Sequence, residues 1–463
     1  MKRSPRESLA ALRSNLDSTL FAPPEPRSSR LGRAETAVLL VAFFALTVVL
    51  LLLRAGPEEA LNSLWAEDGP ILLQEAHAAS MLSALFDPYA GYLVFVPRVV
   101  GEVGGAFPLL DAPAAMAITS GLVTGLSGIA VWLGSGGLIR DPLLRGTLVA
   151  LTVLSPVANL ESVASGAYVP WYMLFACFWI LLWRPRSWWG TAFAAAFLVA
   201  TGMSTPGVWF FLPLACLRAL AARDARDWTI VAAFLAGGLI QLPVIAFNEE
   251  PQVDPVWSAK IWDALLQRVF DGAALGEKIG GQLWRWFGWP FLLLLTAGIL
   301  AGFGYLFAKG PAAVRWVVGF AVPTAIVMFV VSAYQRAVGA PMAWPDDISF
   351  GAGGRYAIVP ALLLVSAALV GIDRLAPRRL AGSTSWPAVL AAAVLLAGLV
   401  AAFDVREPAG RGEPPWDEAV AAAAVACREQ GLEENSVPIS PPPFGIVLPC
   451  AELEGAAGSP SAR

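Results

Sequence analysis

The sequence has a single histidine and little charge of either sign. Only 14% of its 463 residues are charged, whereas a soluble domain has about 25%. One histidine makes a histidine-rich metal centre or a Ser-His-Asp triad an unlikely basis for activity. The Walker A, G-x-S-x-G, H-E-x-x-H and C-x-x-C motifs are also absent from the sequence. Any catalysis would therefore depend on carboxylates, arginines and hydroxyls.

The net charge of −4 gives no indication of a nucleic-acid partner. What the sequence does contain is long apolar runs, with 57% apolar residues overall and a mean hydropathy of +0.64. The run from Ala34 to Leu53 would span about 30 Å as a helix, which matches the hydrocarbon core of a membrane. It is longer than the apolar region of a signal peptide, so we expect an uncleaved first span. The fold class predicted is an all-α polytopic membrane protein.

Eleven apolar runs are long enough to be considered as membrane spans. An odd number of spans places the two termini on opposite sides. The short loops that fall on the side of the N-terminus each carry arginine or lysine, which predicts a cytoplasmic N-terminus and an extracytoplasmic C-terminus. The predicted spans are 34–53, 113–138, 143–159, 169–183, 188–203, 205–220, 228–247, 286–307, 316–333, 356–372 and 387–403.

We therefore divide the chain into a disordered cytoplasmic arm (1–33), a membrane bundle (34–403) and an extracytoplasmic tail (404–463), in a bacterial-type inner or plasma membrane. The tail contains Cys427 and Cys450. Two cysteines in one short extracytoplasmic segment predict a disulfide, and two free thiols are the alternative. The tail is also predicted to contain a helix over 416–430 and two short strands over 436–440 and 446–448.

The first outer loop, residues 54–112, is predicted to hold two helices at the membrane interface. One runs from Pro70 to Phe86, with apolar residues on one face and polar residues on the other. The second follows a turn-rich segment and covers roughly 96–107. Neither is long or apolar enough to cross a membrane.

Two carboxylates, Glu67 and Asp68, precede the first of these helices in the segment Trp65–Pro70. They are open to two compatible interpretations. Asp68 is a good N-cap, and acids are favoured at a helix N-terminus by the helix dipole. Alternatively, Glu67 and Asp68 are catalytic residues or ligands of a divalent metal, for which Mg²⁺ or Mn²⁺ would suit carboxylates.

The order of a cytoplasmic arm, one span, an outer acidic motif, two interfacial helices and a multi-span bundle resembles the GT-C superfamily of glycosyltransferases. The resemblance implies that an acid of the first outer loop acts as base or metal ligand, and Asp68 matches that position. It also implies a basic residue near the lipid phosphate at the second interfacial helix, where Tyr92 and Arg98 lie. The order Glu67-Asp68 differs from the commoner Asp-Glu of the family, which leaves open which carboxylate is the base.

Other outer residues have two interpretations each. Arg98 is four residues from Glu102 and could form a surface pair with it. Glu161 could be a solvated loop acid or a substrate-binding residue. Arg336, Arg355 and Tyr356 could be interfacial anchors, or the arginines could bind a phosphate. Three aromatic residues could form an aromatic belt or stack on a sugar or lipid: Tyr168, Trp171 and Tyr172.

Together these features favour a hexosyl- or pentosyltransferase that moves a sugar from a polyprenyl-phosphate donor to a glycan, lipid or protein acceptor. Such a reaction needs a base for the acceptor hydroxyl and positive charge near the leaving phosphate. From the resemblance we expect inversion at the anomeric carbon. A transporter or lipid flippase and a non-catalytic scaffold are the alternatives. Transporters usually place ionisable residues within their spans, and the predicted spans have none away from their ends.

Overall fold

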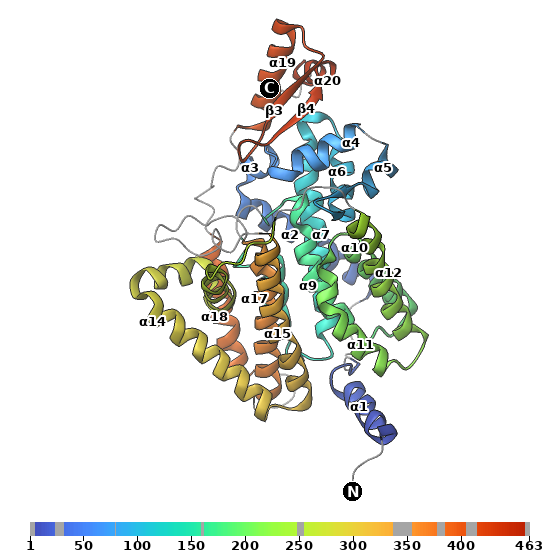
Figure 1. The fold of residues 1–463 in the computed structure, drawn as a ribbon, viewed down its shortest axis with the longest axis vertical. Helices are drawn as coiled ribbons and strands as arrows, with labels where there is room; N and C mark the ends of the chain where they lie inside the picture. Colours follow the sequence, from blue (N-terminus) through green and yellow to red (C-terminus); the bar gives the residue numbers. More distant parts are fainter. Residues whose placement is uncertain are drawn as a thin grey trace.

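The computed structural model describes residues 5–23, 32–78, 80–158, 162–247, 254–336, 354–376, 385–403 and 414–458. Within these residues the chain is almost entirely helical, with two small antiparallel hairpins. Figure 1 shows a helical bundle with the tail at one end and the N-terminal helix at the other. We call these two ends the tail face and the α1 face.

Each predicted span coincides with a helix, but the helices differ in length. Among the described residues, six helical segments are long and apolar enough to cross a membrane, and they contain α2, α7, α12, α14, α15 and α17. The five others have 10–17 residues, so the structure supports a membrane protein without establishing eleven crossings. The helices are α2 (Arg33–Ala55), α7 (Ala112–Ser135), α8 (Pro142–Val153), α9 (Val169–Leu182), α10 (Trp188–Gly202), α11 (Leu212–Ala221), α12 (Ala225–Phe247), α14 (Gly272–Lys309), α15 (Ala312–Gln335), α17 (Arg355–Leu375) and α18 (Trp386–Ala402).

The helix α9 lies at the centre of the bundle and is buried along almost its whole length. Its residues are apolar on every side, which is typical of a helix surrounded by other helices rather than by lipid. It packs against α7 and α17, and Gly134 of α7 approaches the backbone of Trp179 so closely that a Cβ there would collide with it. This close approach fixes the last turn of α9 against the end of α7.

The helical run over Lys260–Lys309 is longer than the predicted span 286–307. It begins with α13 (Lys260–Ala264) and the wide turns of η7 (Leu265–Asp271), and continues into α14. Gly276 and Gly288 have φ of 73° and 60°, and they bend α14 at two points. Positive φ is accessible to glycine at little steric cost, so these two residues permit the bends.

The predicted arm is not disordered throughout. Residues Pro5–Thr19 form α1, and Leu16 within this helix and Phe21 after it are fully buried against the bundle. Asp17 forms ion pairs with Arg184 and Arg223 of two loops at the α1 face. The prediction of disorder was wrong for this segment because the apolar residues and the aspartate have partners that are distant in sequence.

The first outer loop has more breaks than predicted. The expected helix from Pro70 to Phe86 is divided into η2 (Gly69–Leu73), α4 (Gln74–Ala78) and α5 (Met81–Phe86). Ser80 begins α5 by accepting a hydrogen bond from the amide of Ser83 at 3.4 Å. Because of this break, Leu72 is buried whereas Leu82 is 69% exposed, and the two do not share a face. A hairpin of β1 (Pro88–Tyr89) and β2 (Tyr92–Leu93) then leads into α6 (Phe95–Gly105).

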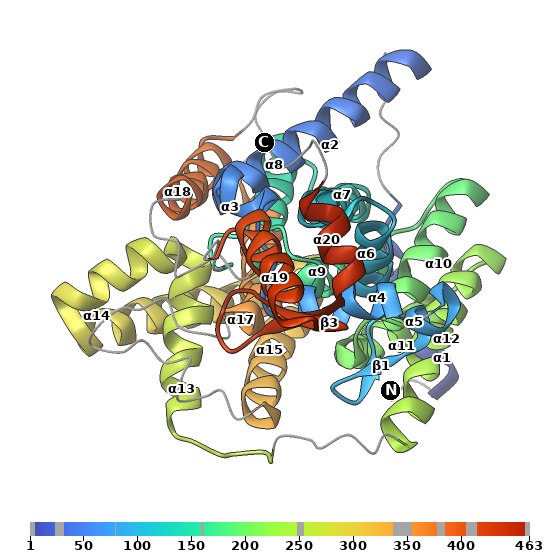
Figure 2. The same ribbon diagram turned by 90° about the horizontal axis from the view of Figure 1, so that it is seen from above.

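The tail consists of α19 (Trp416–Gln430), β3 (Glu434–Pro438), β4 (Gly445–Pro449) and α20 (Cys450–Ala457). The two strands are antiparallel, and the predicted disulfide between Cys427 and Cys450 is confirmed. The tail packs on the first outer loop, a contact that no pattern in the sequence predicts. Trp416 is buried there and donates from its indole to the carbonyl of Leu109 at 2.8 Å. Seen from above in Figure 2, α19 and α20 lie over the bundle.

Candidate functional site

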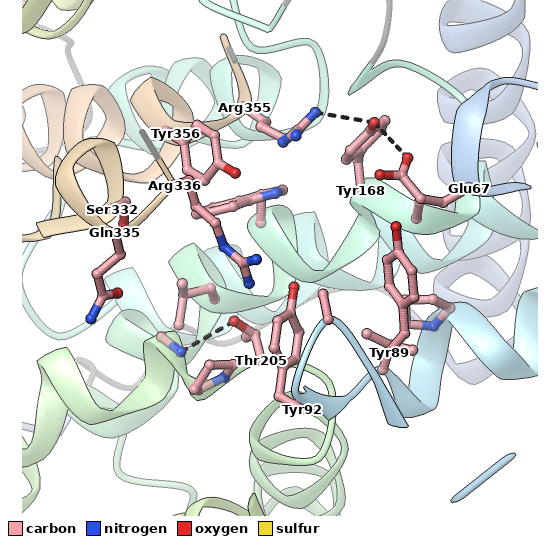
Figure 3. Close-up of a pocket in the computed structure, with 18 of the residues that line it drawn as sticks. Glu67, Tyr89, Tyr92, Tyr168, Thr205, Ser332, Gln335, Arg336, Arg355 and Tyr356 are labelled. Carbon is pink, nitrogen blue, oxygen red and sulfur yellow. Dashed lines mark hydrogen bonds between the residues drawn. The ribbon is translucent and has the colours of Figure 1, made fainter. Parts of the chain in front are cut away.

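A cavity of about 630 Å³ lies at the tail face, where the first outer loop meets the ends of three bundle helices. One wall carries Glu67, Tyr89 and Tyr92 from the first outer loop. The lining also includes Arg336 at the end of α15 and Arg355 at the start of α17 (Figure 3). The remaining lining residues are mostly apolar or aromatic and come from η2, α6, α9, the η6 turn (Pro206–Phe211) and α15.

A chain of hydrogen bonds crosses the cavity wall from an arginine to a carboxylate. Arg355 Nη1 donates to the hydroxyl oxygen of Tyr168 at 3.1 Å, and that hydroxyl donates to Glu67 Oε2 at 3.0 Å. The guanidinium also lies over the Tyr168 ring, 4.9 Å from its centroid. Figure 3 shows the three side chains in line. The tyrosine therefore orients the carboxylate and connects it to a positive charge.

The backbone around Glu67 is held by the tail. Ala66 has a positive φ of 47°, which is uncommon for a residue with a Cβ. Its amide donates to the carbonyl of Ser440 at 2.6 Å, and Trp65 forms a β-bridge with the same residue. Gly69 lies against Ile439, so closely that a Cβ at Gly69 would collide with that side chain. The position of Glu67 thus depends on the tail segment around Ser440, which lies more than three hundred and seventy residues after Ala66 in the sequence.

Asp68 has a different environment from its neighbour. Its side chain is only 5% exposed, and it is not among the residues that line the cavity. Oδ1 accepts a hydrogen bond from the amide of Ala167 at 3.0 Å. The carboxylate makes no capping hydrogen bond to the helical turn that follows, so the capping interpretation is not supported. Asp68 instead joins the motif to the turn η5 (Gly166–Tyr168), and this contact fixes Tyr168 beside Glu67.

Arg98 is also away from the cavity. Its side chain is 1% exposed and forms ion pairs with Glu75 and with Asp87, the latter at 3.4 Å. It also donates to the carbonyl of Ile71. It is therefore neither the surface partner of Glu102 nor a group exposed to a ligand in the cavity. Its contacts hold η2, α4 and the segment before the hairpin against α6.

The two cavity arginines are surrounded by aromatic rings. Arg336 lies 5.6 Å from the ring centroid of Tyr92, and Arg355 lies 5.1 Å from that of Tyr356. A guanidinium is attracted to the face of an aromatic ring, which limits the conformations of both side chains. Arg355 is also the first residue of α17, where the helix dipole adds positive potential. An anion in this part of the cavity would be stabilised by both effects.

Tyr89 lines the cavity beside Glu67 and is near enough to Arg336 and Arg355 to be affected by their charges. Burial, with a smaller effect of the nearby Glu67 charge, raises the pKa of Tyr89 to about 12. Burial likewise raises the pKa of Tyr92, in spite of the opposing charge of Arg336. Both phenols therefore stay neutral at physiological pH and serve as hydrogen-bond donors and ring surfaces rather than as bases.

The structure brings together most of the residues that were selected from the sequence as candidates. The cavity is lined by Glu67, Tyr92, Arg336, Arg355 and Tyr356, and also by Tyr168 and Trp171. Asp68, Arg98 and Tyr172 are elsewhere; the Tyr172 hydroxyl donates to the carbonyl of Ser162 at 2.9 Å. Glu161 lies outside the described residues.

Some lining residues were not predicted. Tyr89 is in the turn-rich segment that was considered only as a connection between helices. Thr205 is in the η6 turn, where its hydroxyl accepts from the amide of Gly207 at 3.2 Å. Ser332 and Gln335 are in the last turns of α15. A tyrosine in a turn could have been selected as a candidate, whereas the threonine and the α15 residues have no distinguishing signal in sequence.

Glu67 is the only acid among the described residues that line the cavity. In the described part of the chain, no group of three or more His, Cys, Asp or Glu side chains is placed to hold a metal ion. Because Asp68 Oδ1 is bonded to Ala167, the two predicted metal ligands do not present a shared face. The residues present thus fit a carboxylate that accepts a proton better than a two-carboxylate metal site.

The arrangement is one carboxylate and two guanidinium groups in the lining of one cavity with aromatic walls. The guanidinium groups of such a site can bind an anionic group, and its aromatic rings can contact a polar molecule that has flat or apolar surfaces. The carboxylate can take a proton from that polar molecule.

Comparisons with protein-family models, with curated proteins and with solved structures find no match for this chain.

Proposed function

We propose that this protein is a membrane glycosyltransferase that moves a sugar from a polyprenyl-phosphate donor to an acceptor hydroxyl on the extracytoplasmic side. The observation that carries the proposal is the presence of Glu67, Arg336 and Arg355 together in the lining of one cavity. In this account the tail face is extracytoplasmic and the α1 face is cytoplasmic, in agreement with the arginines at the latter.

Glu67 acts as the general base in this proposal. It accepts the proton of the acceptor hydroxyl while the acceptor oxygen forms a bond to the anomeric carbon of the sugar. The bond between that carbon and the phosphate oxygen breaks, and the electron pair leaves with the phosphate. Tyr168 holds the carboxylate in place through the 3.0 Å hydrogen bond, so little reorganisation is needed during the reaction.

Arg336 and Arg355 bind the donor phosphate and stabilise the charge that develops as it leaves. Guanidinium groups are suited to this role because their planar donors match phosphate oxygens. The rings of Tyr89, Tyr92 and Trp171 provide surfaces for the sugar or for the first units of the lipid.

The test is donor turnover by the purified protein in liposomes. A set of polyprenyl-phosphate hexoses and pentoses would be supplied with crude envelope acceptor, and release of polyprenyl phosphate would be measured. We expect turnover with at least one donor, and a loss of about tenfold or more in kcat/KM for Arg336→Gln and for Arg355→Gln. Arg315→Gln is the matched control, because Arg315 is an exposed arginine at the opposite face. Equal turnover by all three variants would exclude a phosphate role for these arginines.

One observation favours the alternative of a transporter or lipid flippase. The helical run Lys260–Lys309 contains Asp271, which is fully buried and whose two carboxylate oxygens have no hydrogen-bond partner among the described residues. Near it in sequence, Arg268 and Glu277 form a buried ion pair at 2.7 Å. Buried ionisable groups of this kind are frequent in transport pathways. A lipid-translocation assay in liposomes, in which Asp271→Asn loses activity while Glu67→Gln does not, would support this alternative.

A further inference from the structure

A buried glutamine of α12 contacts the hairpin that carries two tyrosines of the cavity. Gln241 is fully buried, although it lies in an apolar helix that is long enough to cross a membrane. Its side-chain amide binds both backbone polar groups of Leu93 in β2. Nε2 donates to the Leu93 carbonyl at 3.0 Å, and Oε1 accepts from the Leu93 amide at 2.9 Å. One side chain therefore satisfies both the donor and the acceptor of a residue 148 positions earlier in the sequence.

The geometry of the hairpin explains why Leu93 needs such a partner. A two-residue turn, with φ of 52° and 83°, closes the hairpin between Tyr89 and Tyr92. The residues that close a turn of this kind form a hydrogen-bonded pair. The next pair along the hairpin, Pro88 with Leu93, is then one whose backbone groups point away from the opposite strand. Leu93 thus directs its N–H and C=O outward, and Gln241 binds them in the place of a third strand.

The contact matters because this part of the hairpin is shielded from water. Leu93 is 3% exposed, and a buried peptide group without a hydrogen-bond partner is unfavourable. The chain after the hairpin is held by other contacts, since the amide of Phe95 donates to the carbonyl of Met203 at 3.2 Å and the amide of Val96 donates to the hydroxyl of Ser204 at 3.0 Å. Those two bonds hold the start of α6, whereas the glutamine holds the strand itself.

The residue before Leu93 carries the effect into the cavity. Successive side chains of a strand point to opposite faces, so a fixed backbone at Leu93 sets the direction of the Tyr92 ring. The centroid of that ring lies 5.6 Å from the guanidinium of Arg336, and the attraction between the two limits the conformations of the arginine. Figure 3 shows the guanidinium of Arg336 next to Tyr92 in the cavity. Gln241 itself is not among the described residues that line the cavity.

We propose that Gln241 is a positioning residue for anion binding, which fixes β2 and through Tyr92 orients the guanidinium of Arg336 toward a phosphate group. This inference rests on the phosphate role of Arg336 in the proposed function. A guanidinium binds phosphate best when its planar donors face the phosphate oxygens. An Arg336 side chain that is free to turn away would therefore bind the phosphate less tightly, with no change in the charge of the cavity.

The experiment measures the affinity of the full chain in phosphatidylcholine nanodiscs for farnesyl phosphate, a short prenyl monophosphate, by calorimetry after subtraction of empty nanodiscs. Gln241→Leu removes both hydrogen bonds and leaves a side chain of similar size. Gln282→Leu is the matched control, because Gln282 is an exposed glutamine of α14, which is also apolar. Farnesol, which lacks the phosphate, is the second ligand. Hydrogen exchange of the Leu93 amide reports on the contact directly.

We expect farnesyl phosphate to bind about three- to tenfold more weakly to Gln241→Leu than to the wild type, and with unchanged affinity to Gln282→Leu. Farnesol should bind equally to all three proteins. The Leu93 amide should exchange faster in Gln241→Leu alone. When Tyr92→Leu is already present, Gln241→Leu should cause no further loss of affinity, because the ring through which the glutamine acts is absent.

The contrary results are distinct from one another. If Gln241→Leu binds farnesyl phosphate as Gln282→Leu does while Arg336→Gln weakens binding, the inference is overturned and the proposed function stands. An undiminished effect of Gln241→Leu in the presence of Tyr92→Leu, or an equal loss for farnesol, would also overturn it, because the glutamine would then act through general packing. Unchanged affinity in Arg336→Gln would remove the phosphate role and this inference together. If Gln241→Leu does not fold, Gln241→Asn, which is too short to reach both groups of Leu93, is judged by the same outcomes.

Discussion

Tyr168 donates its hydroxyl hydrogen to Glu67 Oε2 at 3.0 Å, although 101 residues separate the two in the sequence. The same hydroxyl accepts from Arg355, which lies a further 187 residues along the chain. The contact joins the first outer loop, the start of α9 and the start of α17 in one hydrogen-bonded chain. It explains why a carboxylate at the entrance to a short helical turn has a defined direction within the cavity.

Replacement of Tyr168 by phenylalanine tests this contact. The ring would remain, and both hydrogen bonds would be lost, so we expect kcat for sugar transfer to fall about tenfold with a smaller change in KM. The thermal midpoint should stay close to that of the wild type. Tyr305→Phe is the matched control, because Tyr305 is 61% exposed and distant in the bundle. Equal rates for the two variants would show that Tyr168 does not orient the base.

The disulfide between Cys427 and Cys450 should matter for the site as well as for the tail. Removing a link that closes a loop of this size lowers the free energy of unfolding of the tail by about 3 kcal/mol. Because Ser440 in the tail holds Ala66 beside Glu67, transfer should also decrease on reduction. Chemical denaturation and transfer would be measured with and without dithiothreitol.

The control for the disulfide is Cys216→Ser, since Cys216 is a free and exposed cysteine. Its response to reduction should equal that of the wild type, whereas Cys427→Ser/Cys450→Ser should no longer respond. Mass spectrometry of non-reduced peptides with both cysteines as free thiols would contradict the account of the tail.

The orientation of the chain in the membrane is a separate prediction. With the arginines of the α1 face in the cytoplasm, a periplasmic-type reporter fused after residue 463 should be active, and a cytoplasmic reporter there should be silent. A fusion in the loop at Arg186 should give the opposite pattern, because that loop lies at the α1 face. Activity of the cytoplasmic reporter at residue 463 would be incompatible with an extracytoplasmic site.

The docking of α1 should depend on pH through Asp17. Burial acts to raise the pKa of this carboxyl, but hydrogen bonds from Arg223 and Arg184 outweigh burial and lower it below the ordinary value of 3.8. A carboxyl with a lowered pKa stabilises the folded state above its ordinary pKa, and this contribution is lost as pH falls through the lowered value. We therefore expect hydrogen-exchange protection of Pro5–Thr19 at pH 7 and its loss below pH 3.8.

The variant Asp17→Asn should lose that protection already at pH 7. Asp263→Asn is the control, because Asp263 pairs only with an exposed lysine at the other end of the bundle. If Asp17→Asn kept full protection of α1 at pH 7, the ion pairs with Arg184 and Arg223 would not be what holds the helix.

The sequence predicted which loops share one side of the bundle, because spans and loops follow from apolar runs and from arginine placement. Because successive predicted spans run in opposite directions, four of the candidate residues are expected on the same side of the bundle. All four line the cavity: Glu67, Tyr92, Arg336 and Arg355. The sequence does not show which of the two carboxylates, Glu67 or Asp68, faces the cavity. In an irregular turn, the directions of adjacent side chains are set by contacts that are distant in the sequence. Those contacts are Tyr168 for one carboxylate and the Ala167 amide for the other.

Two further features depended on tertiary packing that has no local signature. Arg98 is four residues from Glu102, so sequence spacing favoured a surface pair, but the folded loop brings Glu75 and Asp87 to its guanidinium. The tail looked like an independent appendage because its apolar residues, including Trp416, could have formed a core of their own. Instead they share one core with Leu72 and Leu109 of the first outer loop.

The central claim, that Glu67 is the base of a sugar transfer, is tested most directly by comparing Glu67→Gln with Asp68→Asn. Glutamine keeps the size of Glu67 and a hydrogen-bond acceptor for Tyr168, so the fold should be preserved while proton abstraction is lost. Asparagine at position 68 can still accept from the Ala167 amide, and Glu429→Gln on the exposed face of α19 controls for loss of a charge.

The measurement is single-turnover transfer from a polyprenyl-phosphate sugar by each purified variant with a wild-type thermal midpoint. The account predicts a loss of roughly 10²–10⁴ in rate for Glu67→Gln, a much smaller loss for Asp68→Asn and none for Glu429→Gln. A wild-type rate for Glu67→Gln would contradict it.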